Sequence, residues 1–324
     1  MKCAVSVLAL GLLTAQCLPP ASAAVRVARV GLLRTQPRDA PDPAAEGLRR
    51  GLRELGWVEG EQLHYESRFA EGRPERLPGL AAELVRLNVD VIVTGGEQAI
   101  LAAKQATRTI PIVMGASNDP VGAGLVVSLA NPGGNVTGMT ILSPELSRKR
   151  LELLKEVLPR LARVAVLYNP DFPGTTLDLR HTRDAAHALG LTLEPVEVRR
   201  PVDLIPALAA TRQRAEALVP LADPFFTAQR AHLIAFTTKH RLPGMYYWRE
   251  FVEAGGLMSY GPSLLELYRR AATHVDKILK GTRPGELPVE QPTKFDLTVN
   301  AKTAAALHIS IPQSVLIRVD QVVQ

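Results

Sequence analysis

Three short polar motifs in this chain have the residue types of a ligand-binding edge. An Asn or Asp stands before Pro in Asn118-Asp119-Pro120, Tyr168-Asn169-Pro170 and Ala222-Asp223-Pro224. Each pair is typical of a helix start, with the polar side chain as N-cap and proline at the first helical position. Capping by itself explains each motif. If several helix starts meet in one cleft, however, their free N–H groups favour an anion such as a carboxylate.

The segment Thr94-Gly95-Gly96-Glu97-Gln98 is the best single candidate for a binding loop. Two glycines between a strand and a helix allow a ligand to approach the backbone closely, because neither residue carries a side chain. A tight turn is the alternative interpretation of the same two glycines.

The sequence lacks the patterns that would indicate catalysis, a metal site or a cofactor. Its seven histidines include no pair four residues apart and no metal-ligand spacing. There is no G-x-S-x-G nucleophile elbow, no G-x-x-x-x-G-K-[ST] phosphate loop and no G-x-G-x-x-G dinucleotide motif. We therefore expect a protein that binds without making or breaking bonds, with no catalytic residue, metal or cofactor.

Aromatic residues make up only 5% of the chain, so their positions are informative. Those near predicted strand ends include Tyr168, Phe225, Tyr246 and Tyr247. One hypothesis is that these rings stack on a flat apolar ligand. The alternative is that they pack in the hydrophobic core.

The elements that would position these residues alternate between strand and helix. Apolar and β-branched runs predict strands at 25–33, 62–69, 89–94, 109–114, 163–168, 192–198, 217–221, 242–247 and 294–299. Leucines at helical spacing predict helices between them, including 77–87 and 264–279. This alternation indicates parallel sheets with helices on both faces, where ligands bind beyond the carboxyl ends of the strands. Because the strand spacing repeats, we expect an α/β protein of two doubly wound parallel-sheet lobes.

The first residues have the pattern of an export signal. Lys2 precedes the apolar stretch 4–13, and Ala21-Ser22-Ala23 is a cleavage site of small residues, so we expect a signal peptide over 1–23 and a periplasmic protein. Both cysteines, Cys3 and Cys17, fall in this leader. Lipid anchoring at Cys17 is the less favoured alternative, because the preceding Gln16 is not small.

Composition excludes several classes of protein. Hydrophobic residues make up 46% of the 324 residues and charged residues 22%, which excludes a disordered or polytopic membrane protein. The net charge of +6 is spread along the chain without a basic run, so we expect no nucleic-acid partner.

Longer motifs give the chain a family resemblance. They are 52–60, Arg76-Leu77-Pro78, 119–125, 131–138, 149–155, 249–261 and 287–295. Through these segments the chain resembles the extracytoplasmic solute-binding proteins of ABC-type importers, in the family that includes tryptophan- and tyrosine-binding components.

The resemblance implies a type I periplasmic-binding fold with two lobes and a hinge. It places three crossovers near Ile141–Ser143, Gly255–Leu257 and Gly285–Val289. Lobe 1 would then comprise 24–141 with 257–285, and lobe 2 would comprise 142–256 with 286–324. The ligand would lie between the lobes, which close on it by hinge motion.

The resemblance also implies which residues bind the ligand. The loops Thr94–Gln98 and Ala116–Ser117 would hold a carboxylate, and Asp223 would pair with an ammonium group. The complete expected set is Thr35, Thr94, Gly95, Gly96, Glu97, Gln98, Ala116, Ser117, Asp119, Tyr168, Asn169, Asp223, Tyr246 and Tyr247. Glu97 replaces the small residue expected beside the glycines. It would point into the cleft as a second acid or outward as a charge at the helix start, and either orientation weakens the case for an amino-acid ligand.

Together these features indicate a periplasmic importer component that captures a small carboxylate-bearing ligand, such as an aromatic amino acid or aromatic acid. We expect a monomer that delivers this ligand to permease and ATPase subunits in the inner membrane. The alternative is a periplasmic sensing protein that presents its ligand to a membrane receptor or kinase.

Overall fold

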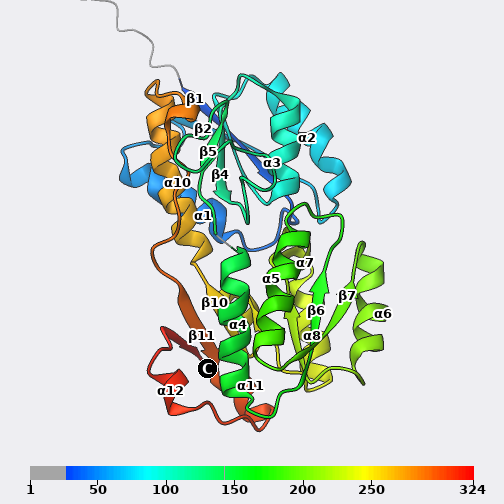
Figure 1. The fold of residues 1–324 in the computed structure, drawn as a ribbon. Coiled ribbons are helices and arrows are strands. Elements are labelled where there is room, and N and C mark those ends of the chain that lie inside the picture. Colours follow the sequence, from blue (N-terminus) through cyan, green and yellow to red (C-terminus); the bar gives the residue numbers. More distant parts are fainter. Residues whose placement is uncertain (1–26, 142) are drawn as a thin grey trace, which may run out of the picture.

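The computed structural model describes residues 27–141 and 143–324, which form two α/β lobes one above the other (Figure 1). The expected signal peptide and Cys17 lie outside these residues. None of the described helices is both long enough and apolar enough to cross a membrane.

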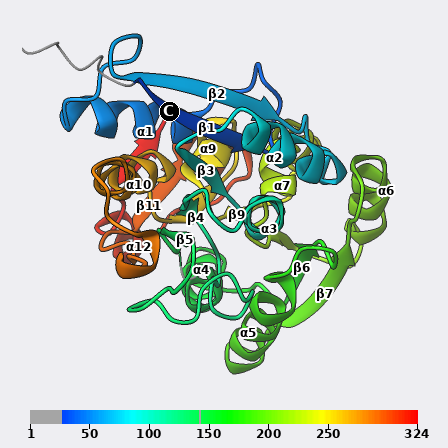
Figure 2. The ribbon, with the colours of Figure 1, turned by 90° about the horizontal axis from the view of Figure 1, so that it is seen from above.

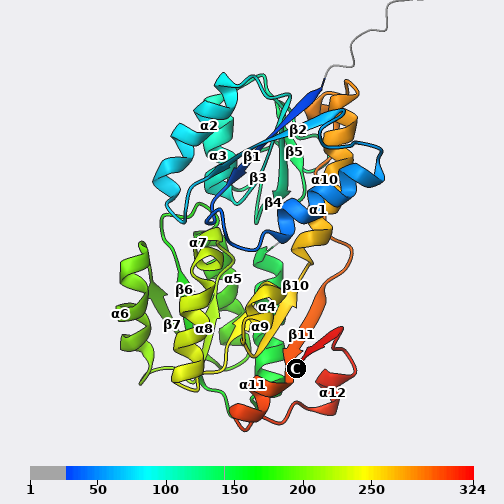
Figure 3. The same cartoon turned by 180° about the vertical axis from the view of Figure 1, so that it is seen from behind.

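The first lobe contains a five-stranded parallel sheet in the order β2-β1-β3-β4-β5. Its strands are β1 (Ala28–Arg34), β2 (Leu63–Phe69), β3 (Val91–Gly95), β4 (Ile112–Ala116) and β5 (Val136–Gly138). The helices that follow them are α1 (Pro43–Glu54), the short 3-10 turn η1 (Pro74–Arg76), α2 (Leu77–Arg86) and α3 (Glu97–Ala106). A later helix, α10 (Leu264–Leu279), returns to this lobe and packs on α1 (Figure 3).

Helices cover both faces of this sheet, as the continuously apolar strands predict. Seen from above, α1 and α10 lie on one side and α2 and α3 on the other (Figure 2). Neighbouring strand residues contribute to opposite cores: Leu32 joins the core on the α1 and α10 side, and Leu33 joins the core on the α2 and α3 side. Because all five strands are parallel, their carboxyl ends lie along one edge of the sheet, and this edge faces the second lobe.

The second lobe is built around two connected sheets. The strands β6 (Arg163–Tyr168), β7 (Thr192–Glu197) and β8 (Ala217–Pro220) are parallel, in the order β7-β6-β8. A parallel bridge between Leu218 and Gly244 links them to a second sheet. That sheet has the order β12-β11-β10-β9, with β9 (Met245–Tyr246), β10 (Met258–Gly261), β11 (Asp296–Asn300) and β12 (Gln321–Val323).

The helices of this lobe follow its strands in the expected alternation. They are α4 (Ser143–Val157), α5 (Thr175–Ala188), α6 (Pro201–Thr211), α7 (Pro224–Ala228), α8 (Arg230–Lys239), α9 (Arg249–Glu253), α11 (Ala301–Ala306) and α12 (Gln313–Leu316). The 3-10 turn η2 (Pro284–Glu286) precedes β11 in the chain but packs on β5 of the first lobe. The predicted fold class is confirmed. One strand departs from it, because β11 runs antiparallel to β10.

We propose revised positions for two of the three expected crossovers. Strand β10 pairs with β9 and β11, which favours a second crossing after Gly261 in place of Gly255–Leu257. A bridge between Met139 and Glu290 ties the chain to the first lobe, which favours a third crossing just after Glu290, next to the expected Gly285–Val289. We therefore propose the lobe limits 27–141 with 262–290, and 143–261 with 291–324.

Close packing of α1 on α10 completes the first lobe. A Cβ atom added at Gly47 would overlap the backbone carbonyl of Leu265, and one added at Gly51 would overlap that of Arg269. The two glycines therefore allow the helix backbones to approach each other directly.

We expect Gly47→Ala to lower the free energy of unfolding in urea by about 1–3 kcal/mol, because a backbone carbonyl cannot turn aside for the new methyl group. Gly79→Ala in α2 is the matched control. No atom lies within 4 Å of a Cβ added there, so this variant should keep its stability or gain up to about 1 kcal/mol. Equal effects of the two substitutions would contradict the close packing of α1 and α10.

Candidate functional site

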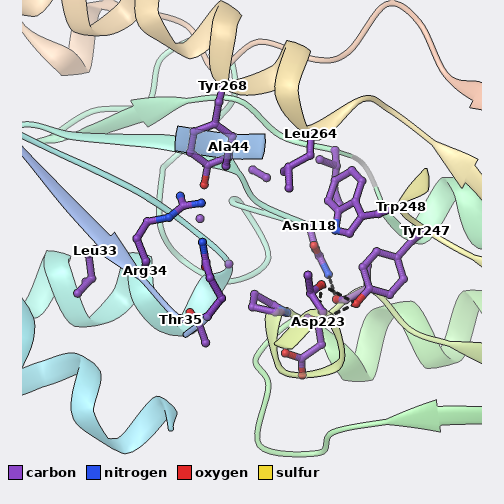
Figure 4. A pocket seen from close by; sticks show the side chains of 18 residues that line it. Leu33, Arg34, Thr35, Ala44, Asn118, Asp223, Tyr247, Trp248, Leu264 and Tyr268 are labelled. Carbon is purple, nitrogen blue, oxygen red and sulfur yellow. Dashed lines mark hydrogen bonds between the residues drawn. The ribbon is translucent and has the colours of Figure 1, made fainter. Parts of the chain in front are cut away.

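A cavity of about 620 Å³, including its opening to solvent, lies between the two lobes (Figure 4). The apolar part of its lining comes mainly from the first lobe, with Leu33, Ala44, Ala116, Ile141 and Leu264. The aromatic residues that line it are Tyr247, Trp248 and Tyr268. A concave, mainly apolar site with a few polar groups is the usual form of a small-molecule site.

Three helix starts meet at this cavity. Ala44 lies in the first turn of α1, Gly96 is the N-cap of α3, and Asp223 with Pro224 begins α7. The convergence follows from topology, because these helices leave the carboxyl ends of β1, β3 and β8.

Arg34 provides the positive charge of the cavity wall. It ends β1 and is buried, and its Nε donates to Asp42 Oδ2 at 3.0 Å while Nη2 bonds Asp42 Oδ1. Its guanidinium also lies over the ring of Tyr268, with Cζ 5.2 Å from the ring centroid. Asp42 is the N-cap of α1 and accepts from Ala45 N at 3.0 Å, so the charge of Arg34 is held in one place.

Asp223 provides a buried carboxylate on the opposite wall. Its Oδ1 caps α7 by accepting from Phe225 N at 2.7 Å, whereas its buried Oδ2 has no hydrogen-bond partner among the described residues. Burial raises the pKa of Asp223 to about 7. The Phe225 N–H and the Asn169 side chain act to lower this pKa, and the nearby Glu97 carboxylate acts to raise it. A cationic ligand group would supply the partner that this oxygen lacks.

Glu97 adopts neither of the two orientations expected for it. Its side chain is fully buried at the start of α3, where Oε1 accepts from Ser117 Oγ at 2.7 Å, from Asn118 N and from Asp119 N at 3.2 Å. Burial raises the pKa of Glu97, and these hydrogen bonds oppose the rise. Donors expected to hold a ligand carboxylate are therefore bound to the protein's own carboxylate.

The two glycines of the binding loop accommodate protein atoms. A Cβ at Gly95 would overlap the hydroxyl of Tyr268, and a Cβ at Gly96 would overlap the ring of Pro224. Gly96 also has a φ of +81°, a conformation that favours glycine. Other atoms do approach the backbone of this loop closely, as expected, but they belong to the side chains of Tyr268 and Pro224.

Direct hydrogen bonds between the lobes show that the cleft is closed. Asn118 Nδ2 donates to the carbonyl of Ala222 at 2.6 Å, and Gln98 Nε2 donates to the carbonyl of Asp171 at 3.2 Å. The contact between Gly96 and Pro224 lies in the same interface.

The expected ligand-binding residues separate into two groups. Those that line the cavity are Thr35, Gly95, Gly96, Ala116, Asp223 and Tyr247. The others bind protein groups: Thr94 Oγ1 donates to Leu33 O at 2.8 Å, Asp119 Oδ1 accepts from Gly122 N at 2.8 Å, and Asn169 Oδ1 accepts from Asp171 N at 3.1 Å. The Asn169 side chain also adjoins the cavity residue Asp223, whose pKa it lowers. Gln98, Glu97 and Ser117 make the contacts described above.

Most of the aromatic residues selected from the sequence are packing residues. Tyr246 stacks on Phe251 with 4.8 Å between ring centroids, Phe225 packs edge-on against Phe226, and the Tyr168 hydroxyl lies 3.4 Å from Glu197 Oε2. Tyr247 does reach the cavity, and its hydroxyl donates to the carbonyl of Asp223 at 2.8 Å.

Several cavity residues were not predicted from the sequence. Arg34 and Trp248 each adjoin a predicted residue, Thr35 and Tyr247, so a wider window at each strand end would have included them. Tyr268 lies within α10, and its helical periodicity indicates only a buried face. No group of three or more His, Cys, Asp or Glu residues within 27–141 and 143–324 is placed to hold a metal ion.

Comparisons with known proteins agree with this geometry. A family model described as ABC transporter substrate binding protein matches residues 30–323. The Tyrosine-binding protein of Clostridioides difficile (strain R20291) is 24% identical over 279 residues, which is 86% of this chain and 80% of that protein.

Two solved structures are similar over most of the chain. A conserved domain protein from Vibrio cholerae is 31% identical, with a TM-score of 0.87, and the match covers 92% of this chain and all (100%) of that one. The ABC domain in complex with L-Trp from Streptococcus pneumoniae is 26% identical, with a TM-score of 0.86 and the same coverage of 92% and 100%.

The closed interface predicts that a disulfide can lock the lobes together. A Cβ at Gly174 would lie 3.6 Å from the Cβ of Asn118, within the range of disulfides. We expect the double variant Asn118→Cys, Gly174→Cys, made without the leader, to form an intramolecular disulfide under air oxidation. Small-angle scattering should then give a smaller radius of gyration for the oxidised than for the reduced protein.

The control combines Asn118→Cys with Gly79→Cys, because Gly79 lies on α2 with no atom near its added Cβ. This pair should leave both thiols free to react with a maleimide. Free thiols in the Asn118 and Gly174 pair would show that the lobes do not meet as described.

Proposed function

This chain belongs to the family of ABC transporter substrate-binding proteins, and on that premise we propose that its ligand is an aromatic amino acid. The observation that carries the proposal is the unpartnered, buried Oδ2 of Asp223 in a cavity with aromatic walls. A ligand ammonium group would pair with this oxygen, and an aromatic side chain would lie among Tyr247, Trp248 and Tyr268.

The lining and charge of the cavity support this ligand class. Its walls combine apolar and aromatic side chains with a few polar groups, which is the usual composition of a small-molecule site. Arg34 lies on the wall opposite Asp223, so the two charges suit a ligand that carries both signs. The similar L-Trp complex and the similar tyrosine-binding protein favour the same class of ligand.

The proposal also includes where in the cell the protein acts. A signal peptide over 1–23 would export the chain, and the mature monomer would capture its ligand in the periplasm. The lobes would close on the ligand and present their outer surfaces to the permease and ATPase subunits of an importer. Interlobe hydrogen bonds from Asn118 and Gln98 would stabilise the closed form.

We expect Asp223→Asn to weaken the binding of L-tryptophan or L-tyrosine more than tenfold, a loss above about 1.4 kcal/mol. The amide oxygen can still cap α7, so the melting temperature should change little. Isothermal titration calorimetry measures the affinity. Asp119→Asn is the matched control, since this Asp also precedes a proline but lies outside the cavity lining.

The affinity of the unchanged protein for L-tryptophan or L-tyrosine should rise with pH. A proton on Asp223 must leave before an ammonium group can pair with the carboxylate, and the pKa of Asp223 is about 7. The dissociation constant should therefore be about tenfold larger at pH 6 than at pH 8. Asp223→Asn should abolish this dependence, and a flat profile in the unchanged protein would remove Asp223 from the binding step.

A further inference from the structure

Glu97 occupies a preformed seat for a carboxylate. The seat consists of three donors in the loop after β4: the Ser117 hydroxyl and the backbone N–H groups of Asn118 and Asp119. All three donate to one oxygen, Glu97 Oε1. Charge-assisted bonds of this kind are stronger than neutral ones, so the seat is well suited to an anion.

Both sides of this seat are fixed by the backbone. Gly96 N donates to the carbonyl of Ala116 at 2.9 Å, which holds the start of α3 against the end of β4. The carbonyl of Ser117 in turn accepts from Ile141 N at 2.8 Å and from Thr140 Oγ1 at 3.0 Å. The three donors therefore keep their geometry independently of the Glu97 side chain.

The seat adjoins the proposed ligand-binding cavity. Asn118 lines that cavity, and its side chain spans the cleft to the carbonyl of Ala222, next to Asp223. A ligand carboxylate directed to the loop after β4 would meet the carboxylate of Glu97 already in place.

Two acidic oxygens lack partners at this interface. Glu97 Oε2 and Asp223 Oδ2 are both buried without a hydrogen bond among the described residues. Arg34, the cation in the cavity lining, lies on the opposite wall, where it bonds Asp42 and remains the charge that suits a ligand carboxylate directed away from this loop. A second anion beside these oxygens would be repelled, whereas a cation would be attracted.

We propose that Glu97 determines ligand specificity by filling the carboxylate seat at Ser117–Asp119 with its own side chain. The site then recognises its ligand through an ammonium group at Asp223 and closes this loop to a ligand carboxylate. The inference rests on the proposed function, because it takes the ligand to be an ammonium-bearing molecule in the same cavity.

The first test measures whether the seat binds a carboxylate, without any physiological ligand. Glu97→Ala would leave the three donors unpaired, and formate is the smallest carboxylate that could bind them. We expect this variant to melt below the unchanged protein. Replacing sodium chloride with sodium formate at equal ionic strength should then raise its melting temperature by at least about 2 °C.

Controls for this test separate a vacant seat from a general salt effect. The unchanged protein and Glu97→Gln should show no selective response to formate, because their side chains still fill the seat. Recovery of folded Glu97→Ala only in formate would support the proposal equally. If this variant is insoluble in both salts, Glu97→Ser takes its place under the same criterion. An equal response to formate and chloride in the vacant-seat variant would overturn the proposal.

The second test uses two probes that differ only by a carboxylate, L-tryptophan and tryptamine. The ratio of their dissociation constants measures how strongly the site favours the carboxylate. Relative to the unchanged protein, Glu97→Ala should shift this ratio at least tenfold toward L-tryptophan, because the vacated donors can bind its carboxylate. Glu61→Ala removes an exposed carboxylate from a turn before β2 and should not shift it.

An unchanged ratio in Glu97→Ala would overturn the specificity role. The two tests also separate this inference from the proposed function. If neither probe binds the unchanged protein, the aromatic amino-acid assignment fails. The formate response still decides whether Glu97 fills a carboxylate seat.

Discussion

A carboxylate removed from water must gain a partner, and this requirement shapes the centre of the molecule. Asp223 and Glu97 are both buried where the lobes meet, and each satisfies one oxygen with protein donors. The start of α7 donates a hydrogen bond to Asp223, and the loop after β4 donates hydrogen bonds to Glu97. The remaining oxygens give the closed cleft an unsatisfied negative character, which a cationic group is suited to complement.

The fold explains how these groups come together. Parallel strands in each lobe direct their carboxyl ends, and the helix starts that follow, toward the same gap. Uncharged residues then join the lobes: the Asn118 amide donates to the backbone of the second lobe, and Gly96 leaves room for Pro224. The same loops therefore contribute both to the closure of the lobes and to the recognition of the ligand.

Sequence reasoning predicted what depends on local patterns. Apolar runs located β1, β3, β4, β6 and β8, and the Asp-Pro pair correctly marked Asp223 as a helix cap. The pairs Asp119-Pro120 and Asn169-Pro170 begin turns and not helices. It could not predict the partner of Glu97, because Ser117 lies 20 residues away and only the pairing of β3 with β4 brings them together. The revised second crossover that we propose has a similar cause, since a local window of sequence cannot reveal the pairing of Met258 with Val299.

The path of the chain has a consequence for how the protein reaches its working form. Helix α10, which supplies Tyr268 and Leu264 to the cavity, follows most of the second lobe in sequence, yet it packs on α1 near the beginning. Contacts of such long sequence separation form slowly, because a large loop must close first. A growing chain therefore cannot complete its first hydrophobic core until synthesis is almost finished.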